Sequence, residues 1–489
     1  MSYSYDHILI VGLGKSGQAT ARFLLSRADV LGLKSLTLVD SADSKELTAF
    51  YTELESLNTG GVELAAHFGY EELPPRSGAA RADGGALELY DLCVMTPGLA
   101  PHTALSKAAV RHSREVISEI ELAYRLAPEG VIWVAITGTN GKTTTTELVR
   151  AVLSADSNSS RAVYSVGNIG TPALELLDIL RSGDILVAEV SSFQAARLSS
   201  FRPAVAALLN LSSDHLDWHK DIASYAQDKC ALFARSGLGD LVLAPTEEQM
   251  HLDARDVIGQ ALDAAATRGA EVQTLQPHPE YLPISPQQLA IQGRHNLTNA
   301  CFATAVARYF AVPESDIAEG LKSFSPQPHR MQELGRYNQV LYVNDSKATN
   351  ADSAMQALSG YQGLELILIL GGKEKSASCA DVQACLGPEY ADLAKMALDR
   401  AASVLLFGHA APRLKACFDL QAGASTAQIP VLCFESLREA TCYAYQHARP
   451  QQVVLLSPAN ASFDEFDNFE QRGLEFARYL KELAGQVGS

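Results

Sequence analysis

The stretch VAITGTNGKTTTTELV, at residues 134–149, constrains the fold more than any other part of the sequence. An apolar run is followed by a glycine loop, Gly138 to Thr143, and then by a helical pattern. Glycines let backbone N–H groups close on phosphate oxygens, Lys142 can reach the β- and γ-phosphates, and Thr143 can bind Mg²⁺. Ile136 stands where the general phosphate loop has its first glycine, so this is a shorter form. The order of strand, loop and helix predicts a parallel α/β sheet with a nucleotide at its edge.

A second glycine motif lies near the start of the chain. GLGKSG, at residues 12–17, follows the apolar run Ile8–Val11 and precedes a helical segment. This is the G-x-G-x-x-G order that places a helix N-terminus against a diphosphate. Asp40 ends the next apolar run, where a dinucleotide-binding fold has its ribose-binding acid. On these residues alone, an NAD-dependent oxidoreductase is one hypothesis for the chain.

The length of 489 residues exceeds one ordinary hydrophobic core, and the sequence divides into three blocks. Short apolar runs alternate with helical stretches in the blocks, which predicts mostly parallel sheets. We expect domains at residues 1–121, 122–326 and 327–489, with an exposed loop at Pro74–Ala86. Besides the run before Gly138, the expected strands are Ile8–Val11, Ser35–Val39, Leu92–Met95, Ile185–Val190, Ala204–Leu209, Val340–Val343, Leu364–Leu370, Ser403–Phe407 and Gln452–Leu456.

Composition narrows the classes of function. The formal net charge of −17 repels nucleic acid and anionic membranes, so we expect small-molecule partners and a local cationic pocket for any anionic substrate. The eight cysteines contain no C-x-x-C pair, which favours reduced thiols over a zinc site or a disulfide framework. No apolar run approaches the roughly 20 residues that span a bilayer, and the first strand begins too early for a signal peptide. We therefore expect a cytoplasmic monomer without membrane insertion.

Acidic and histidine side chains follow two of the expected strands. Glu189 ends one strand, where a nucleotide-binding sheet offers a second magnesium carboxylate. The segment LLNLSSDHLDWH brings Asp214, His215, Asp217 and His219 together just after another strand. Magnesium prefers oxygen ligands but accepts one histidine, whereas zinc would need more His or Cys at tetrahedral spacing. From the residues alone, a metal site and an ordinary polar loop are equally good interpretations of this segment.

The chain resembles the Mur ligases from Gly12 to about Leu480. NDSKATN, NFEQRG and SSFQ are similar to the members that add D-glutamate, whereas the middle motifs are shared with other Mur ligases and with folylpolyglutamate synthases. The resemblance implies three α/β domains: an N-terminal Rossmann-like domain, a central P-loop ATPase-like domain with a mostly parallel sheet, and a C-terminal Rossmann-like domain. The motifs that carry it are AITGTNGKTTTTELV, GNIGTPAL, EVSSFQ, NLSSDHLD, GRHNLTNACFA, PHRMQEL, VNDSKATN and LLSPANASFDEFDNFEQRGLEFARYL.

The reaction implied by this resemblance is an ATP-dependent amide ligation in peptidoglycan precursor synthesis. The carboxylate of UDP-N-acetylmuramoyl-L-alanine takes the γ-phosphoryl group of ATP, and the amine of D-glutamate attacks the acyl phosphate, which gives ADP and phosphate. A carboxylate is a poor electrophile until one oxygen becomes a leaving group. Phosphoryl transfer itself needs mainly charge neutralisation and alignment, which two Mg²⁺ ions and Lys142 would supply.

The resemblance also implies roles for individual residues. Lys142, His215 and Lys229 would be catalytic, with Thr143 and Glu189 on one metal and His215 and a carbamylated Lys229 on the other. The UDP-substrate would contact Gly14, Lys15, Ser16, Asp40 and Asn168, so the first glycine loop would hold the diphosphate of that substrate. D-glutamate would contact Thr349, Lys375, Ser462 and Phe469. ATP would contact Gly138, Thr139, Asn140, Gly141, Lys142, Thr143, Thr144, Asn296, Asn299, Arg330 and Asp345.

Some positions depart from the pattern of the family. Asn460 stands where Cys is common, and Ala42 follows Asp40 at a position where Arg is often seen. Lys373 competes with Lys375 as an anion-binding residue.

The alternative functions are another Mur ligase or a folylpolyglutamate synthase, the NAD-dependent oxidoreductase, and a non-catalytic nucleotide-binding regulator. The last two leave the GTNGKT loop or the metal and lysine positions without a role.

Overall fold

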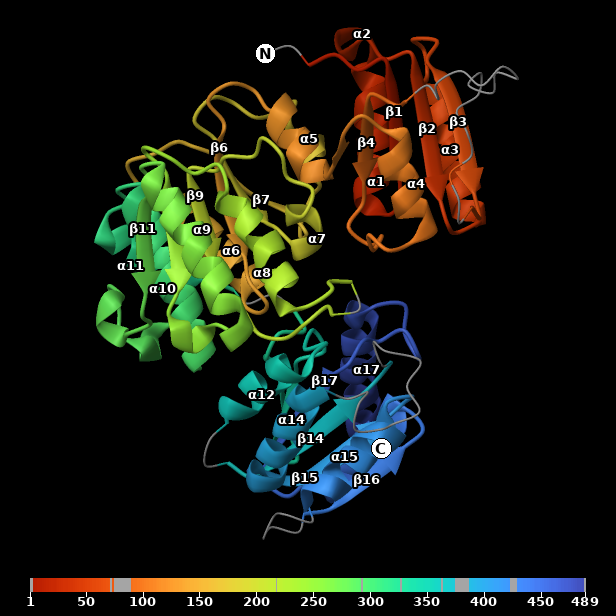
Figure 1. Cartoon of the computed structure of the whole chain (residues 1–489). Coiled ribbons are helices and arrows are strands. Elements are labelled where there is room, and N and C mark those ends of the chain that lie inside the picture. The colour runs from red at the N-terminus through yellow and green to blue at the C-terminus, as the bar shows by residue number, and fades with distance from the viewer. Residues whose placement is uncertain are drawn as a thin grey trace. The chain divides into compact units, whose positions relative to one another are not determined.

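The structure is a computed structural model that describes residues 3–70, 73, 89–216, 218–291, 293–325, 328–361, 364–373, 387–422 and 429–487. The chain forms two compact units. One contains residues 1–285 and 298–322, and the other contains residues 286–297 and 323–489. Both units have an α/β architecture. The first contains two of the β-sheets described here, and the second contains one (Figure 1).

The first sheet has the strand order β3-β2-β1-β4-β5, and its strands are parallel. The order reverses beside β1, which places the glycine loop after β1 at the point where doubly wound sheets bind ligands. The strands are β1 (His7–Val11), β2 (Ser35–Asp40), β3 (Glu63–Phe68), β4 (Leu92–Met95) and β5 (Val116–Ile117). The helices are α1 (Lys15–Ser26), α2 (Ala28–Leu31), α3 (Lys45–Leu57), α4 (Ala104–His112) and α5 (Glu119–Leu126).

The second sheet has the order β11-β10-β9-β6-β8-β7 and is also parallel. Because β8 and β9 flank β6, the segments that follow these three strands meet at one edge of the sheet. The strands are β6 (Ile132–Thr137), β7 (Val163–Gly167), β8 (Ile185–Glu189), β9 (Val205–Leu208), β10 (Leu241–Pro245) and β11 (Glu271–Leu275). The helices are α6 (Lys142–Ser154), α7 (Ser192–Ala195), α8 (Ile222–Cys230), α9 (Arg255–Thr267), α10 (Arg294–Tyr309) and α11 (Glu314–Ser323).

The third sheet has the order β12-β13-β17-β14-β15-β16, with β12 antiparallel to β13 and the other pairs parallel. Asn338 and Gln339, both with positive φ, form the two-residue turn of the β12–β13 hairpin. The strands are β12 (Gln332–Tyr337), β13 (Val340–Asn344), β14 (Leu366–Gly371), β15 (Ala401–Phe407), β16 (Val431–Phe434) and β17 (Val453–Ala459). The helices are α12 (Ala351–Ser359), α14 (Gly387–Arg400), α15 (Ala411–Ala422), α16 (Leu437–His447) and α17 (Phe469–Val487).

The predicted α/β class is confirmed, and every strand expected from the sequence is present within two residues at each end, apart from the last, which extends to Ala459. The strands that the sequence did not reveal are β10 and the two edge strands of each sheet. The predicted joins at residues 121 and 326 stay predictions; residue 121 lies within α5, and 326 lies outside the described residues. The predicted loop Pro74–Ala86 also lies outside them.

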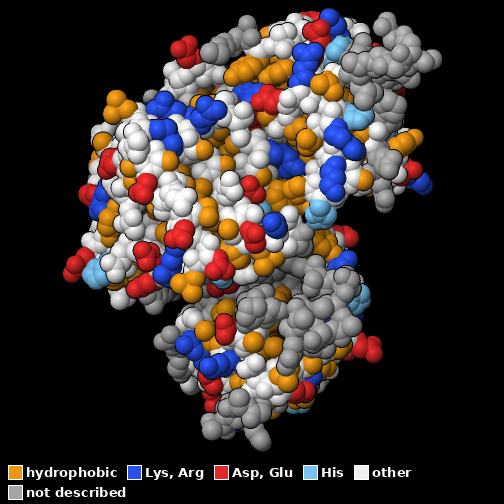
Figure 2. Space-filling model, in the orientation of Figure 1, with side chains coloured by type: hydrophobic (Ala, Val, Ile, Leu, Met, Phe, Trp, Pro, Cys, Tyr) orange, Lys and Arg blue, Asp and Glu red, His pale blue; other side chains and the backbone are white. Residues whose placement is uncertain are grey.

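No helix in the described part of the chain is long and apolar enough to cross a membrane. Acidic and basic side chains are interspersed on the face seen in Figure 2. The described cysteines, which are Cys93, Cys230, Cys301, Cys417, Cys433 and Cys442, are free thiols.

Candidate active site

The central phosphate loop joins β6 to α6. Gly141 is the residue before the helix and has φ +80°, and a Cβ atom there would lie 2.5 Å from Asn299 Oδ1. Asn299 in turn accepts a hydrogen bond from Thr145 Oγ1 at 3.1 Å. Glycine is therefore required at the start of α6, both for the backbone conformation and for the approach of Asn299.

The segment that follows β9 braces this loop. Asn210 Oδ1 accepts from the Asn140 amide at 2.9 Å, and Asn210 Nδ2 donates to the Asn140 carbonyl at 3.0 Å. Thr139 Oγ1 donates to the Ser212 carbonyl at 3.1 Å. These bonds hold the loop in the shape that leaves the first N–H groups of α6 directed toward an anion.

Two lysines converge on the loop. Lys142 Nζ donates to the carbonyls of Gly138 at 2.9 Å and Thr139 at 2.7 Å. Lys229 Nζ, from α8, donates to the same Gly138 carbonyl at 2.8 Å and lies 3.4 Å from Thr137 Oγ1. Lys229 is 1% exposed. Burial, followed by the positive charge of Lys142, lowers the pKa of Lys229 well below the ordinary lysine value, which favours its neutral amine.

Glu189 ends β8 beside the loop and is 2% exposed. Its Oε1 accepts a hydrogen bond from Asn168 Nδ2 at 2.8 Å, whereas its buried Oε2 has no hydrogen-bond partner among the described residues. A buried carboxylate oxygen without a donor is costly unless a cation neutralises it. The donor set of Glu189 and the buried hydroxyl of Thr143 is of the oxygen type that Mg²⁺ prefers, so these residues fit a magnesium ion.

The segment after β9 carries the predicted histidine ligand. His215 has φ +57°, and its ring lies edge-on to Phe193 with centroids 4.8 Å apart. His215 Nε2 lies 3.5 Å from Asp214 Oδ2. Both nitrogens of His219 contact protein groups, Ser192 Oγ at 2.9 Å and Asp228 Oδ2 at 3.0 Å. His219 is therefore not available as a metal ligand. Asp217 lies outside the described residues, which contain no group of three or more His, Cys, Asp and Glu side chains able to hold a metal.

The N-terminal glycine loop borders a cavity of about 400 Å³, whose lining includes Gly14, Lys15, Ser16 and Asp40. Lys15 Nζ donates to the carbonyl of Gly170, in the segment that also carries Asn168, at 2.7 Å. The Asp40 carboxylate accepts from the backbone amides of Leu13 at 2.6 Å and Ala42 at 2.8 Å. In this structure, therefore, Asp40 stabilises the loop itself.

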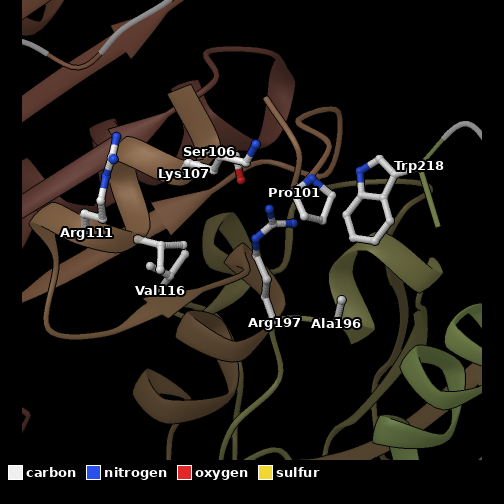
Figure 3. A pocket seen from close by; sticks show the side chains of 9 residues that line it. Pro101, Ser106, Lys107, Arg111, Val116, Ala196, Arg197 and Trp218 are labelled. Atoms are coloured by element: carbon white, nitrogen blue, oxygen red, sulfur yellow. The ribbon is translucent and has the colours of Figure 1, made fainter. Parts of the chain in front are cut away.

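A larger groove of about 600 Å³ lies apart from the residues predicted from the sequence. Figure 3 shows that α4 contributes Ser106, Lys107 and Arg111, whereas Arg197 extends toward it from the other side. The Arg197 guanidinium lies 5.7 Å from the centre of the Trp218 ring and donates to the Leu99 carbonyl at 3.2 Å.

The predicted ATP-base and ribose residues fall in both units. Asn299 belongs to the first unit, and Asn296, one turn earlier in α10, belongs to the second with Arg330 and Asp345. Asp345 accepts from Ser457 Oγ at 2.8 Å and from the Met331 amide at 3.2 Å. Burial raises the pKa of Asp345 to about 7, although these bonds and the charge of Arg330 oppose the shift.

The predicted amino-acid site is described in part. Ser462 is buried, Thr349 and Phe469 are half-buried, and Lys375 lies outside the described residues. Lys347 Nζ lies 3.6 Å from the centre of the Phe469 ring, which places a cation beside one of the predicted contacts. Sequence reasoning missed Lys347, although it stands between Asp345 and Thr349 in the quoted motif.

Arg472 was also missed, and it joins the two loops of this site. It is fully buried and donates to Ser346 Oγ at 2.9 Å and to the Ser346 carbonyl at 2.8 Å. It also donates to the carbonyls of Asn460 and Ala461, both at 3.0 Å. The NFEQRG motif contains this arginine, but only the tertiary structure reveals its acceptors.

Comparison with known proteins identifies the family. The model of the Mur ligase middle domain matches residues 136–307, and that of the Mur ligase glutamate ligase domain matches residues 329–460. A UDP-N-acetylmuramoylalanine–D-glutamate ligase of Pelotomaculum thermopropionicum is 33% identical over 492 residues, 98% of each chain. The chain belongs to the Mur ligase family. The D-glutamate ligase of Thermobifida fusca, 34% identical over 98% of each chain, agrees, so the resemblance seen in the sequence is confirmed.

Solved structures of other Mur ligases share the fold. The UDP-N-acetylmuramate–alanine ligase of Thermotoga maritima matches with a TM-score of 0.55 at 16% identity, over 97% of this chain and 99% of that one. The MurF ligase of Acinetobacter baumannii matches with a TM-score of 0.53 at 18% identity, over 81% and 91% of the two chains. These likenesses support the three-sheet α/β architecture of the Mur ligase described here.

Proposed function

We propose that this Mur ligase adds D-glutamate to UDP-N-acetylmuramoyl-L-alanine, with ATP converted to ADP and phosphate, in peptidoglycan precursor synthesis. The observation that carries the proposal is its similarity along nearly the whole chain to ligases of that name, at 32–34% identity. The loop, the two lysines and the buried carboxylate at the edge of the second sheet supply chemistry that suits the reaction.

The first step activates a carboxylate. Lys142 and the N–H groups at the start of α6 bind the phosphates of ATP and align the γ-phosphoryl group with the substrate carboxylate. Transfer gives an acyl phosphate, and the amine of D-glutamate then attacks the acyl carbon and expels phosphate. Thr143, Glu189, His215 and a carbamylated Lys229 would hold two Mg²⁺ ions, which would neutralise phosphate charge.

The environment of Lys229 supports the proposed carbamate. A buried lysine with a lowered pKa presents a neutral amine, whose nitrogen attacks the carbon of CO₂, forms an N–C bond and loses a proton. The product is an anionic oxygen ligand. It would place an anion beside Lys142, where a protonated Lys229 would meet like-charge repulsion.

The other two substrates would each bind at a different set of loops. The UDP-substrate would lie in the cavity beside Gly14, Lys15 and Ser16, and Asn168 would contact its muramoyl end. D-glutamate would contact Thr349, Lys375, Ser462 and Phe469, with Lys347 as a further cation. We further propose that the protein is cytoplasmic, because ATP and UDP-linked precursors are cytoplasmic. We also propose that it is a monomer, which sedimentation velocity tests.

The function is tested by phosphate release with ATP, Mg²⁺ and UDP-N-acetylmuramoyl-L-alanine, with candidate amino acids added one at a time. D-glutamate alone should support turnover. Release that depends on another amino acid, or on a folate acceptor, would contradict the proposal.

The carbamate is tested by Lys229→Ala. Activity should fall steeply and return in part when a short-chain carboxylic acid is added, since the acid supplies the lost oxygen ligand. Lys220→Ala, which removes an exposed lysine from the neighbouring loop, is the matched control. A fully active Lys229→Ala would remove Lys229 from the site.

A further inference from the structure

His219 lies at the centre of a hydrogen-bonded chain within the central sheet region. Its Nδ1 lies 3.0 Å from Asp228 Oδ2, and its Nε2 lies 2.9 Å from Ser192 Oγ. A carboxylate only accepts hydrogen bonds, so the chemistry of the partners assigns a proton to Nδ1, and Nε2 pairs with the hydroxyl of Ser192. The histidine thereby joins the start of α7 to the end of α8.

Each member of this chain belongs to a segment that carries a proposed metal ligand. Ser192 follows Glu189 by three residues, and Asp228 immediately precedes Lys229. The His219 amide donates to the carbonyl of another proposed ligand, His215, at 2.9 Å. His219 therefore contacts, through its ring and its backbone amide, the segments of three of the four proposed metal ligands.

The surroundings of His219 fix the orientation of its ring. The ring is nearly parallel to that of Phe193, at 20° and 5.7 Å, and its centroid lies 4.5 Å from Trp218 and 4.9 Å from Tyr225. The residue is 4% exposed. Helix α8 has nine residues, fewer than the roughly 12 that an isolated helix needs in water, so tertiary contacts must determine where it presents Lys229.

We propose that His219 is a positioning residue. Through Ser192 and Asp228, it holds the segments of Glu189, His215 and Lys229 in the relative positions that metal binding requires. This inference rests on the proposed function. Serine, histidine and aspartate also form the nucleophilic triads of hydrolases, but Ser192 is 2% exposed, so its hydroxyl has no access to a substrate. The hydrogen bonds of His219 with Ser192 and Asp228 therefore support the segments that carry the proposed metal ligands.

The test compares His219→Phe, which keeps a ring for the aromatic contacts, with His219→Gln, whose amide can still donate and accept. Asp240→Asn is the matched control, because Asp240 accepts from Arg202 at 2.6 Å and from the Gly237 amide at 2.9 Å, away from the proposed site. Mn²⁺ binding by electron paramagnetic resonance and the carbamate signal with isotopically labelled bicarbonate are measured for each protein. Folding of each protein is checked by its far-ultraviolet circular dichroism spectrum.

His219→Phe should weaken Mn²⁺ binding by about 10- to 100-fold and reduce the carbamate signal, the range typical for groups that support metal ligands. His219→Gln should recover part of both, and Asp240→Asn should match the wild type. Unchanged Mn²⁺ binding and carbamate in folded His219→Phe would overturn the inference. If His219→Phe does not fold, an unchanged Ser192→Ala, which removes the hydroxyl from Nε2, would overturn it. Turnover is not needed for these measurements, so an error in the proposed amino acid would appear separately, in the phosphate-release assay.

Discussion

The two glycine loops of this Mur ligase have the same local structure, but the residues around them differ. Each follows a buried parallel strand, and each leads into a helix whose first residue is a lysine, Lys15 or Lys142. Lys142 contacts the carbonyls of its own loop, whereas Lys15 reaches a carbonyl of Gly170 in another segment. Side chains brace both loops, Asn210 the central one and Asp40 the N-terminal one, and the N-terminal loop also borders a cavity. These surroundings suit the different roles proposed for the two loops, a reaction centre and an anchor for the UDP-substrate.

The largest expected difference between the loops is in catalysis. Lys142→Ala should lower kcat by about 1000-fold, because it removes the cation nearest the transferring phosphoryl group. Lys15→Ala should mainly raise KM for the UDP-substrate by about tenfold, as expected for one lost charged hydrogen bond. Steady-state kinetics of the two variants measures both effects. Equal effects on kcat would show that the loops do not differ in the way proposed.

A second difference concerns the glycine before each helix. Gly141 has φ +80° and would clash with Asn299, so Gly141→Ala should destabilise the protein by about 3 kcal/mol. Gly14 has φ −65°, and a Cβ added there would meet no atom within 4 Å, so Gly14→Ala should stay within about 0.5 kcal/mol of the wild type. Urea denaturation measures the free energies of unfolding. A raised KM of folded Gly14→Ala for the UDP-substrate would support close approach of the diphosphate there.

A further prediction concerns Glu119, on α5 between the two loops in sequence. Its Oε1 accepts from the Leu174 amide at 3.2 Å, its buried Oε2 has no partner in the described part of the chain, and burial raises its pKa to about 7. Because the folded pKa lies above the unfolded value, the folded state binds the proton more tightly, and stability falls as pH rises from about 4.5 through 7.

Glu119→Gln removes this titration. Relative to the wild type, the variant should gain about 1 kcal/mol of stability per pH unit between about 4.5 and 7, with the gain levelling off above 7. Below pH 4.5 the two proteins should show parallel pH dependence. Urea titrations at several pH values measure the difference, and a gap that does not change with pH would contradict the assigned pKa.

The sequence predicted every interior strand of the three sheets except β10, and none of the six edge strands. Interior strands such as β8 and β14 are buried throughout and appear as continuous apolar runs. The edge strands β3, β11, β12 and β16 are partly exposed, and their mixed residues give no such run. The interior strand β10 was missed for another reason, since its apolar run LVLAP is short and ends in proline.

The candidate site also contains some features that the sequence predicts and others that only the tertiary structure shows. The sequence alone identified both glycine loops and Glu189, because a loop motif and a strand end are local features that the chain order determines. Only the tertiary structure decided the environments of Lys229 and His219. Helix α8 buries Lys229 against the carbonyl of Gly138. His219 resembled a metal ligand until the fold placed Ser192 and Asp228 at its two nitrogens. Burial and partnership depend on residues far apart in the chain, and these contacts form only when the sheet is assembled.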